Sequence, residues 1–125
     1  MILIVDSWAW LAATESEEIA DKSLKYINDR KNLLYTTYLN IYEVYYRIKE
    51  QSNEEEARKF VESIKNRAII MNIDEELSLL AGNIHLNEKM SAVDAFVYAA
   101  AIKVDGKVLT GDPHFKGKES VIFIE

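Results

Sequence analysis

Residues 1–7 read Met-Ile-Leu-Ile-Val-Asp-Ser. Five consecutive apolar residues without polar alternation predict a short strand that is buried on both faces, as in a parallel sheet. Asp6 places a carboxylate at the end of that strand, where an ionised group is costly unless a partner compensates its charge. The alternative role for Asp6 is the N-cap of a short helix that starts near Trp8, with Ser7 as a competing cap.

Short apolar segments alternate with helical patterns along the whole chain. Further strands are predicted at Leu33–Thr37, Ala68–Ile73, Lys107–Thr110 and Val121–Ile124. Helical periodicity covers Glu17–Arg30, Tyr38–Glu50, Asn53–Asn66, Glu75–Asn87 and Ala92–Val104. Strands that alternate with helices pair in parallel through right-handed crossovers. We therefore expect one α/β domain over residues 1–125, a three-layer α/β/α sandwich around a mainly parallel sheet of about five strands.

Composition limits the chemistry and the partners. The chain has no cysteine, which excludes thiolate metal sites, thiol nucleophiles and disulfides. Its 15 basic and 21 acidic residues give a net charge of −6, which argues against tight nonspecific binding of nucleic acid. An enzyme that meets nucleic acid through a bound metal and a local basic rim remains compatible with this charge. Asp6 interrupts the first apolar run too early for a signal peptide, and no run is long enough for a membrane span, so we expect a cytoplasmic protein.

Two more acidic residues lie at predicted element ends. Asp112 follows the strand Lys107–Thr110. Ligand sites of parallel α/β sheets lie at the carboxyl ends of the strands, so Asp6 and Asp112 belong to one edge. Asp94 is the lone charge in the first turn of a helix of small apolar residues, where the helix dipole favours an ionised carboxylate. The alternatives are an ordinary turn residue for Asp112 and a capping-box partner of Ser91 for Asp94.

Glu43 is a fourth candidate, inside a tyrosine-rich helix. Its alternative role is an ion pair with Arg47, four positions later. Asn40, Glu43 and Arg47 form a polar stripe on this helix, which either faces solvent or lines a site. Four converging carboxylates repel one another unless a cation joins them, so a divalent metal site and phosphodiester hydrolysis are the first hypothesis.

The acidic motifs resemble those of the PIN-domain nucleases, and the short single-domain form is similar to the VapC toxins of bacteria and archaea. The motifs are Ile4-Val5-Asp6-Ser7, Asn40-Ile41-Tyr42-Glu43-Val44, Ser91-Ala92-Val93-Asp94-Ala95 and Thr110-Gly111-Asp112-Pro113-His114-Phe115. The resemblance covers essentially the whole chain, with the four acids in the family's order.

This resemblance implies a metal-dependent endoribonuclease that hydrolyses RNA phosphodiester bonds with metal-activated water. The catalytic and metal-binding residues that it implies are Asp6, Glu43, Asp94 and Asp112. They would hold one or two Mg²⁺ ions, for which Mn²⁺ can substitute. Ser7, Asn40 and Thr110 match supporting positions around the ligands. The family also implies a homodimer and a small cognate antitoxin that blocks the groove.

Basic residues must also meet the RNA backbone. Arg47, Lys116 and Lys118 are the candidates, although a solvated surface charge is the ordinary role of each. His114 is a candidate for contact with the substrate, whereas His85 lies in an amphipathic helix remote from the motifs and is expected to be structural.

Two other functions are compatible with an α/β sandwich that carries acidic strand ends. A receiver-like signalling domain needs an acidic pair after the first strand, but Asp6 is followed by Ser7. Its phosphoacceptor would have to be Asp74, which has the pattern of a helix cap. A PIN-fold scaffold or RNA-binding adaptor without turnover is the remaining alternative.

Overall fold

The computed structural model describes all residues, 1–125, and is built on a five-stranded parallel sheet. The strands are β1 (Ile2–Val5), β2 (Leu33–Thr37), β3 (Ile69–Met71), β4 (Lys107–Thr110) and β5 (Val121–Phe123). Every neighbouring pair is parallel, in the order β3-β2-β1-β4-β5. This confirms the predicted α/β class, and the sheet is wholly rather than mainly parallel.

The strand order defines where a ligand site belongs. The chain builds outward from β1 through β2 to β3, and then returns to the other side of β1 to add β4 and β5. In open parallel sheets the crevice lies outside the carboxyl ends of the strands, where the order reverses, which here is between β1 and β4. The receiver-like alternative is wrong, because that fold has the order 2-1-3-4-5.

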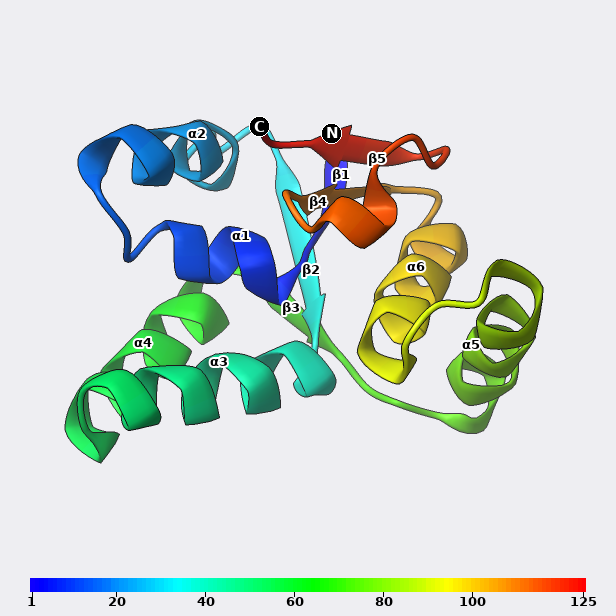
Figure 1. Ribbon diagram of the computed structural model, residues 1–125, viewed down its shortest axis with the longest axis horizontal. Coiled ribbons are helices and arrows are strands. Elements are labelled where there is room, and N and C mark those ends of the chain that lie inside the picture. The colour runs from blue at the N-terminus through cyan, green and yellow to red at the C-terminus, as the bar shows by residue number, and fades with distance from the viewer.

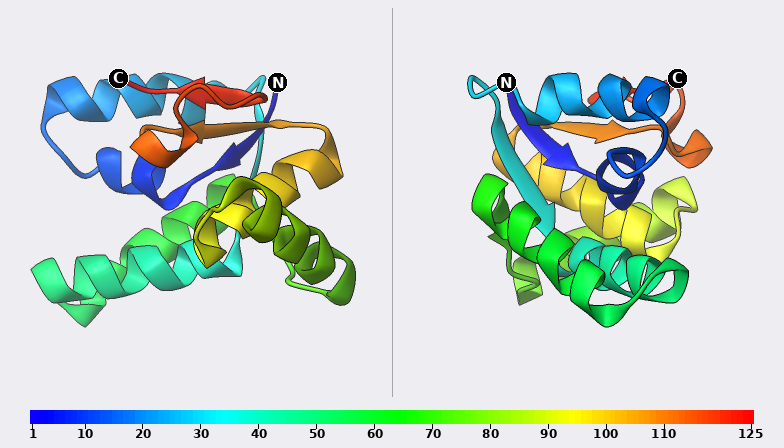
Figure 2. Two further views of the ribbon diagram at one scale, coloured as in Figure 1. Left: turned by 45° about the vertical axis from the view of Figure 1, so that its right-hand side comes forward. Right: turned by 90° about the vertical axis from the view of Figure 1, so that its left-hand side faces the viewer.

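Six helices cover the two faces of the sheet. They are α1 (Ser7–Ala12), α2 (Glu17–Ile27), α3 (Tyr38–Gln51), α4 (Glu54–Arg67), α5 (Glu75–Glu88) and α6 (Ala92–Val104). Helices α1 to α4 lie on one face and α5 and α6 on the other (Figure 1). Helices α3 and α4 lie side by side, as do α5 and α6, and the two helix pairs point away from each other (Figure 2). None of the helices combines the length and the apolar character that crossing a membrane requires.

The core explains why β1 reads as an unbroken apolar run. Leu3, Ile4 and Val5 are all fully buried. Ile4 packs with α5 and α6, whereas Leu3 and Val5 pack with the helices of the opposite face. Alternate side chains of a strand point to opposite faces, so a central strand covered on both sides needs apolar residues at every position.

The N-cap residues of the helices differ in whether their side chains cap the helix. Asn53 and Asp74 cap α4 and α5, and each side chain accepts a backbone N–H three residues later. Asp6 and Ser91 occupy the N-cap positions of α1 and α6 but make no side-chain cap hydrogen bond. The capping roles considered for these two positions are therefore not realised, and the Asp6 carboxylate is left for other contacts.

Three predicted elements end earlier than their sequence patterns, and one of them is the strand predicted at Val121–Ile124, which ends at Phe123. The segment Ala68–Ile73 forms only the three residues of β3, which end at Met71. The strand starts one residue late because the Ala68 N–H still closes the last turn of α4. The pattern Glu17–Arg30 is helical only to Ile27, after which Asn28 is the C-cap.

Candidate active site

Four acidic side chains from four elements line one cleft. Asp6 follows β1, Glu43 lies on α3, Asp94 lies in the first turn of α6, and Asp112 follows β4 by two residues. The cleft has a volume of about 480 Å³, and all four carboxylates contribute to its wall. The four sequence-predicted acids therefore lie on one cleft, at the edge where the strand order reverses. Only Asp94, Asp112 and His114 form a group whose ligand atoms lie within 4.8 Å of one another, and Asp6 and Glu43 are outside it.

Asp6 is the most enclosed of the four acids. Its side chain is only 3% exposed. The Thr110 hydroxyl donates to its Oδ2 at 2.7 Å, and the Asn40 amide lies 3.4 Å from its Oδ1. Burial raises the pKa of Asp6 from 3.8 to about 7; the Thr110 bond opposes this, while the charges of Asp94 and Asp112 add to it. Asp6 makes no ion pair with any lysine, arginine or histidine, so its charge lacks a cation.

Asn40 ties α3 to the loop that carries Asp6. Its Oδ1 accepts from the Thr37 backbone N–H at 3.1 Å and from the Thr37 hydroxyl at 2.7 Å. Its Nδ2 donates to the Ser7 hydroxyl at 2.9 Å. Asn40 is fully buried, so all its polar atoms are committed to these contacts. The helix that carries Glu43 thus starts at a point held against Asp6 and Ser7.

The polar stripe of α3 reaches the cleft one turn later. Glu43 and Arg47 both line the cleft, and they form a long ion pair of 3.8 Å. Such an exposed pair contributes little to stability, on the order of 0.3–0.5 kcal/mol for this helical spacing. Glu43 therefore makes the i,i+4 ion pair and also lines the cleft.

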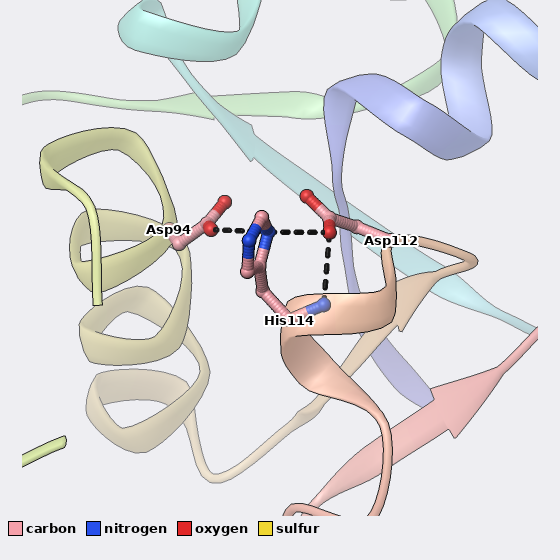
Figure 3. Close-up of side chains that lie close together, drawn as sticks. All are labelled: Asp94, Asp112 and His114. Atoms are coloured by element: carbon pink, nitrogen blue, oxygen red, sulfur yellow. Dashed lines mark hydrogen bonds and ion pairs between the residues drawn. The ribbon is translucent and has the colours of Figure 1, made fainter. Parts of the chain in front are cut away.

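Asp94 and Asp112 face each other across the cleft, with His114 between them (Figure 3). Nδ1 of His114 lies 2.8 Å from Oδ1 of Asp112 and 3.8 Å from Oδ2 of Asp94. The same Asp112 oxygen accepts the His114 backbone N–H at 2.9 Å. Burial raises the pKa of Asp94, and the charge of Asp112 raises it further. This cluster could bind a metal ion.

Thr110 links Asp6 and Asp112. Its hydroxyl oxygen accepts the Asp112 backbone N–H at 3.0 Å while its proton goes to Asp6. One buried hydroxyl thus positions the loops after β1 and β4 relative to each other. The supporting role of Thr110 can be predicted from the sequence because Thr110 lies two residues before Asp112.

The predicted RNA-contact residues are not all at the cleft. Arg47 lines it, but Lys116 and Lys118 do not. Lys116 pairs with Glu125 at 3.5 Å, and Lys118 pairs with Glu88 at 3.1 Å.

The wall of the cleft also contains residues that the motifs do not include. Trp8, Leu11 and Ile19 supply apolar surface to it. A Cβ added at Gly111 would lie 2.5–2.6 Å from three consecutive carbons of the Trp8 six-membered ring. Near-equal distances to three adjacent ring atoms place Gly111 over the ring face, so the indole packs flat on the loop that carries Asp112. Nothing in the sequence indicates this contact, which joins residues far apart in the chain.

The donor set suits a divalent metal ion. The four carboxylates offer only oxygen ligands, which Mg²⁺ and Mn²⁺ prefer. Asp6 and Asp94 are both desolvated and lie near other negative charges. An ion beside Asp94 and Asp112 would compensate the charges of these two carboxylates and reduce their repulsion of Asp6.

Comparisons with known proteins agree with this architecture. Residues 3–119 match the model of the PIN domain family. No curated protein matches the sequence. Among solved structures, Mycobacterium tuberculosis VapC20, described as a Sarcin-Ricin loop cleaving toxin, superposes with a TM-score of 0.80 at 15% identity, over 95% of this chain and 96% of that one. A toxin–antitoxin complex from Klebsiella pneumoniae gives a TM-score of 0.80 at 14% identity, over 98% of each chain.

A third similar structure is VapBC2 from Rickettsia felis bound to a DNA fragment from its promoter. It gives a TM-score of 0.75 at 14% identity, over 98% of this chain and 97% of that one. At such identities the structural likeness establishes the fold alone, whereas the family match covers nearly the whole sequence. The chain belongs to the PIN domain family.

Proposed function

We propose that this protein is a metal-dependent endoribonuclease and the toxin of a type II toxin–antitoxin pair. The observation that carries the proposal is the cleft that Asp6, Glu43, Asp94 and Asp112 line, with Asp6 buried and without a cationic partner. Such an arrangement is costly for a metal-free protein and useful only when a cation is bound. The family supplies the reaction type, hydrolysis of a phosphodiester.

The residues of the chain take distinct roles in this proposal. The four acids would hold Mg²⁺ or Mn²⁺, which when bound generates a hydroxide-like nucleophile from water and stabilises charge on the phosphate. Thr110, Asn40 and Ser7 hold the Asp6 loop in place through the hydrogen bonds described above. Arg47 presents its guanidinium, half exposed, at the mouth of the cleft, where it can contact a phosphate of the RNA backbone.

Partners follow from the same reasoning. The Klebsiella and Rickettsia structures are toxin–antitoxin assemblies, and this supports a small antitoxin as the partner that keeps the nuclease inactive. Tyr38 and Tyr42 expose 52% and 62% of their surface on α3, and aromatic residues of this kind are enriched at protein interfaces. We propose that this face serves a homodimer and that the protein acts on RNA in the cytoplasm.

The test is RNA cleavage by the purified, metal-free protein after addition of Mn²⁺ or Mg²⁺. Cleavage should appear with the ion, disappear with a chelator, and be lost in Asp94→Asn. The matched control is Asp74→Asn, which removes an acid that caps α5 outside the cleft. Cleavage that survives both the chelator and Asp94→Asn would contradict the proposal. Metal binding without any cleavage would instead support the adaptor without turnover.

A further inference from the structure

His114 occupies the space between two of the proposed metal ligands. Its Nδ1 is 2.8 Å from Asp112 and 3.8 Å from Asp94, and one ligand atom from each residue lies within 4.8 Å of the other two. The His114 backbone N–H also donates to Asp112, which keeps the backbone of this residue beside that carboxylate. Figure 3 shows the imidazole between the two carboxylates, and 78% of the His114 side chain is exposed to solvent.

These spacings match those of ligand atoms around one ion. With metal–ligand bonds of about 2.1 Å, neighbouring ligands at right angles are about 3.0 Å apart. The observed separations of 2.8 and 3.8 Å lie on either side of that value. The three side chains are therefore close enough together for one ion to contact all of them.

The same contact can also be an ordinary hydrogen bond, in which Nδ1 donates to Asp112. The two interpretations differ in where the proton lies. A hydrogen bond needs the proton on Nδ1, whereas a metal ligand needs the lone pair there and the proton on Nε2. They also differ in consequence, because an imidazole ligand changes which ion the site prefers.

We infer that His114 supplies a nitrogen ligand to the metal held by Asp94 and Asp112. This inference rests on the proposed function, because it concerns the same metal. Imidazole strengthens binding of Co²⁺, Ni²⁺ and Zn²⁺, while Mg²⁺ prefers oxygen and gains little from it. The site is thus tuned toward nitrogen-binding divalent ions, which four carboxylates alone would not achieve.

The experiment compares the binding of Co²⁺ and Mg²⁺ by calorimetry to wild type, His114→Ala and His85→Ala. His85 is the only other histidine, is exposed, and lies on α5, so its variant is the matched control. His114→Ala should weaken Co²⁺ binding by about tenfold or more but Mg²⁺ binding by less than about threefold. His85→Ala should change neither. Equal losses for both ions would mean that His114 only positions Asp112, and the inference would be wrong.

A second measurement needs no substitution at His114. With two histidines in the chain, the ring nitrogen signals in an NMR titration with Zn²⁺ can be assigned through His85→Ala. The Nδ1 signal of His114 should move from the position of a protonated to that of a metal-bound nitrogen. An unchanged signal, while Zn²⁺ binds, would overturn the inference but leave the nuclease proposal intact. If wild type binds none of the three ions, the proposed function fails as well.

Discussion

Replacing Asp6 by asparagine should stabilise the metal-free protein above neutral pH and destabilise it in acid. Burial raises the pKa of Asp6 from 3.8 to about 7 in the folded state, a difference worth about 4 kcal/mol. Below pH 4 the carboxyl is neutral in both the folded and the unfolded chain, and no cost arises. Between pH 4 and 7 only the unfolded chain releases the proton, so the free energy of unfolding falls by about 1.4 kcal/mol per pH unit. Above pH 7 the full cost persists.

Asparagine removes this titration but loses a hydrogen bond. Oδ2 of Asp6 accepts from Thr110 and Oδ1 lies near the Asn40 amide. An asparagine has a single acceptor oxygen, so its NH₂ group must face one of these two donors. The mismatch costs about 1–2 kcal/mol. The variant should therefore be less stable than wild type near pH 4, equal to it near pH 5, and more stable by about 2–3 kcal/mol at pH 8.

Urea unfolding in the presence of chelator, at pH 4.5 and at pH 8, measures the difference in the free energy of unfolding between the variant and wild type. Asp21→Asn, which removes an exposed carboxylate from α2, should change the free energy of unfolding by less than about 0.5 kcal/mol at either pH. Saturating Mn²⁺ should then restore wild type above pH 7 and have a much smaller effect on the Asp6 variant. A variant that is less stable than wild type at pH 8 without metal would refute the argument from burial.

Three further predictions concern packing, the cleft and the ion. Gly111→Ala should cost about 1–3 kcal/mol and shift the fluorescence of Trp8, because its Cβ would lie 2.5–2.6 Å from the indole. Gly82 lies in α5, and a Cβ added there would meet nothing within 4 Å. Gly82→Ala should therefore stabilise the folded protein by about 0.5–1 kcal/mol. Thermal melts of the two variants should shift in opposite directions. In an Asp94→Asn background, which should not cleave RNA, Arg47→Gln should weaken RNA binding and reduce its salt dependence by about one phosphate contact, whereas Lys118→Gln should change neither. Salt titrations of the affinity test this. Addition of metal at 100 times its dissociation constant should raise the free energy of unfolding by about 2.7 kcal/mol, and an unshifted melting curve would argue against a metal site.

The sequence predicted the position of an acidic residue where the order and direction of the strands and helices determine that position. Asp6 and Asp112 follow parallel strands, and such strand ends must lie at one edge of the sheet. Asp94 stands out as a charge in a helix of small apolar residues that has to be buried. These two arguments need no knowledge of individual side-chain contacts.

Other features of the site depend on contacts between distant segments and could not be predicted in this way. The bond from Asn40 to Ser7 spans 33 residues, and the packing of Trp8 on Gly111 joins the first and fourth strand ends. Lys118 follows the Asp112 loop in sequence, yet its side chain turns to Glu88. Proximity along the chain places a backbone near the cleft but does not determine where a long side chain points.

The hydrogen bond from Thr110 to Asp6 joins residues 104 positions apart, and this has a consequence during synthesis. A ribosome makes a chain from its N-terminus at roughly 5–20 residues per second, so Asp6, Glu43 and Asp94 all emerge before β4 exists. Until then β1 has a free edge, and neither Thr110 nor Asp112 is available to complete the cleft. A nascent chain therefore passes most of its translation without the full set of carboxylates. Where the product is a nuclease, the ribosome and the message that make it are exposed to the finished enzyme only after nearly the entire domain has left the exit tunnel.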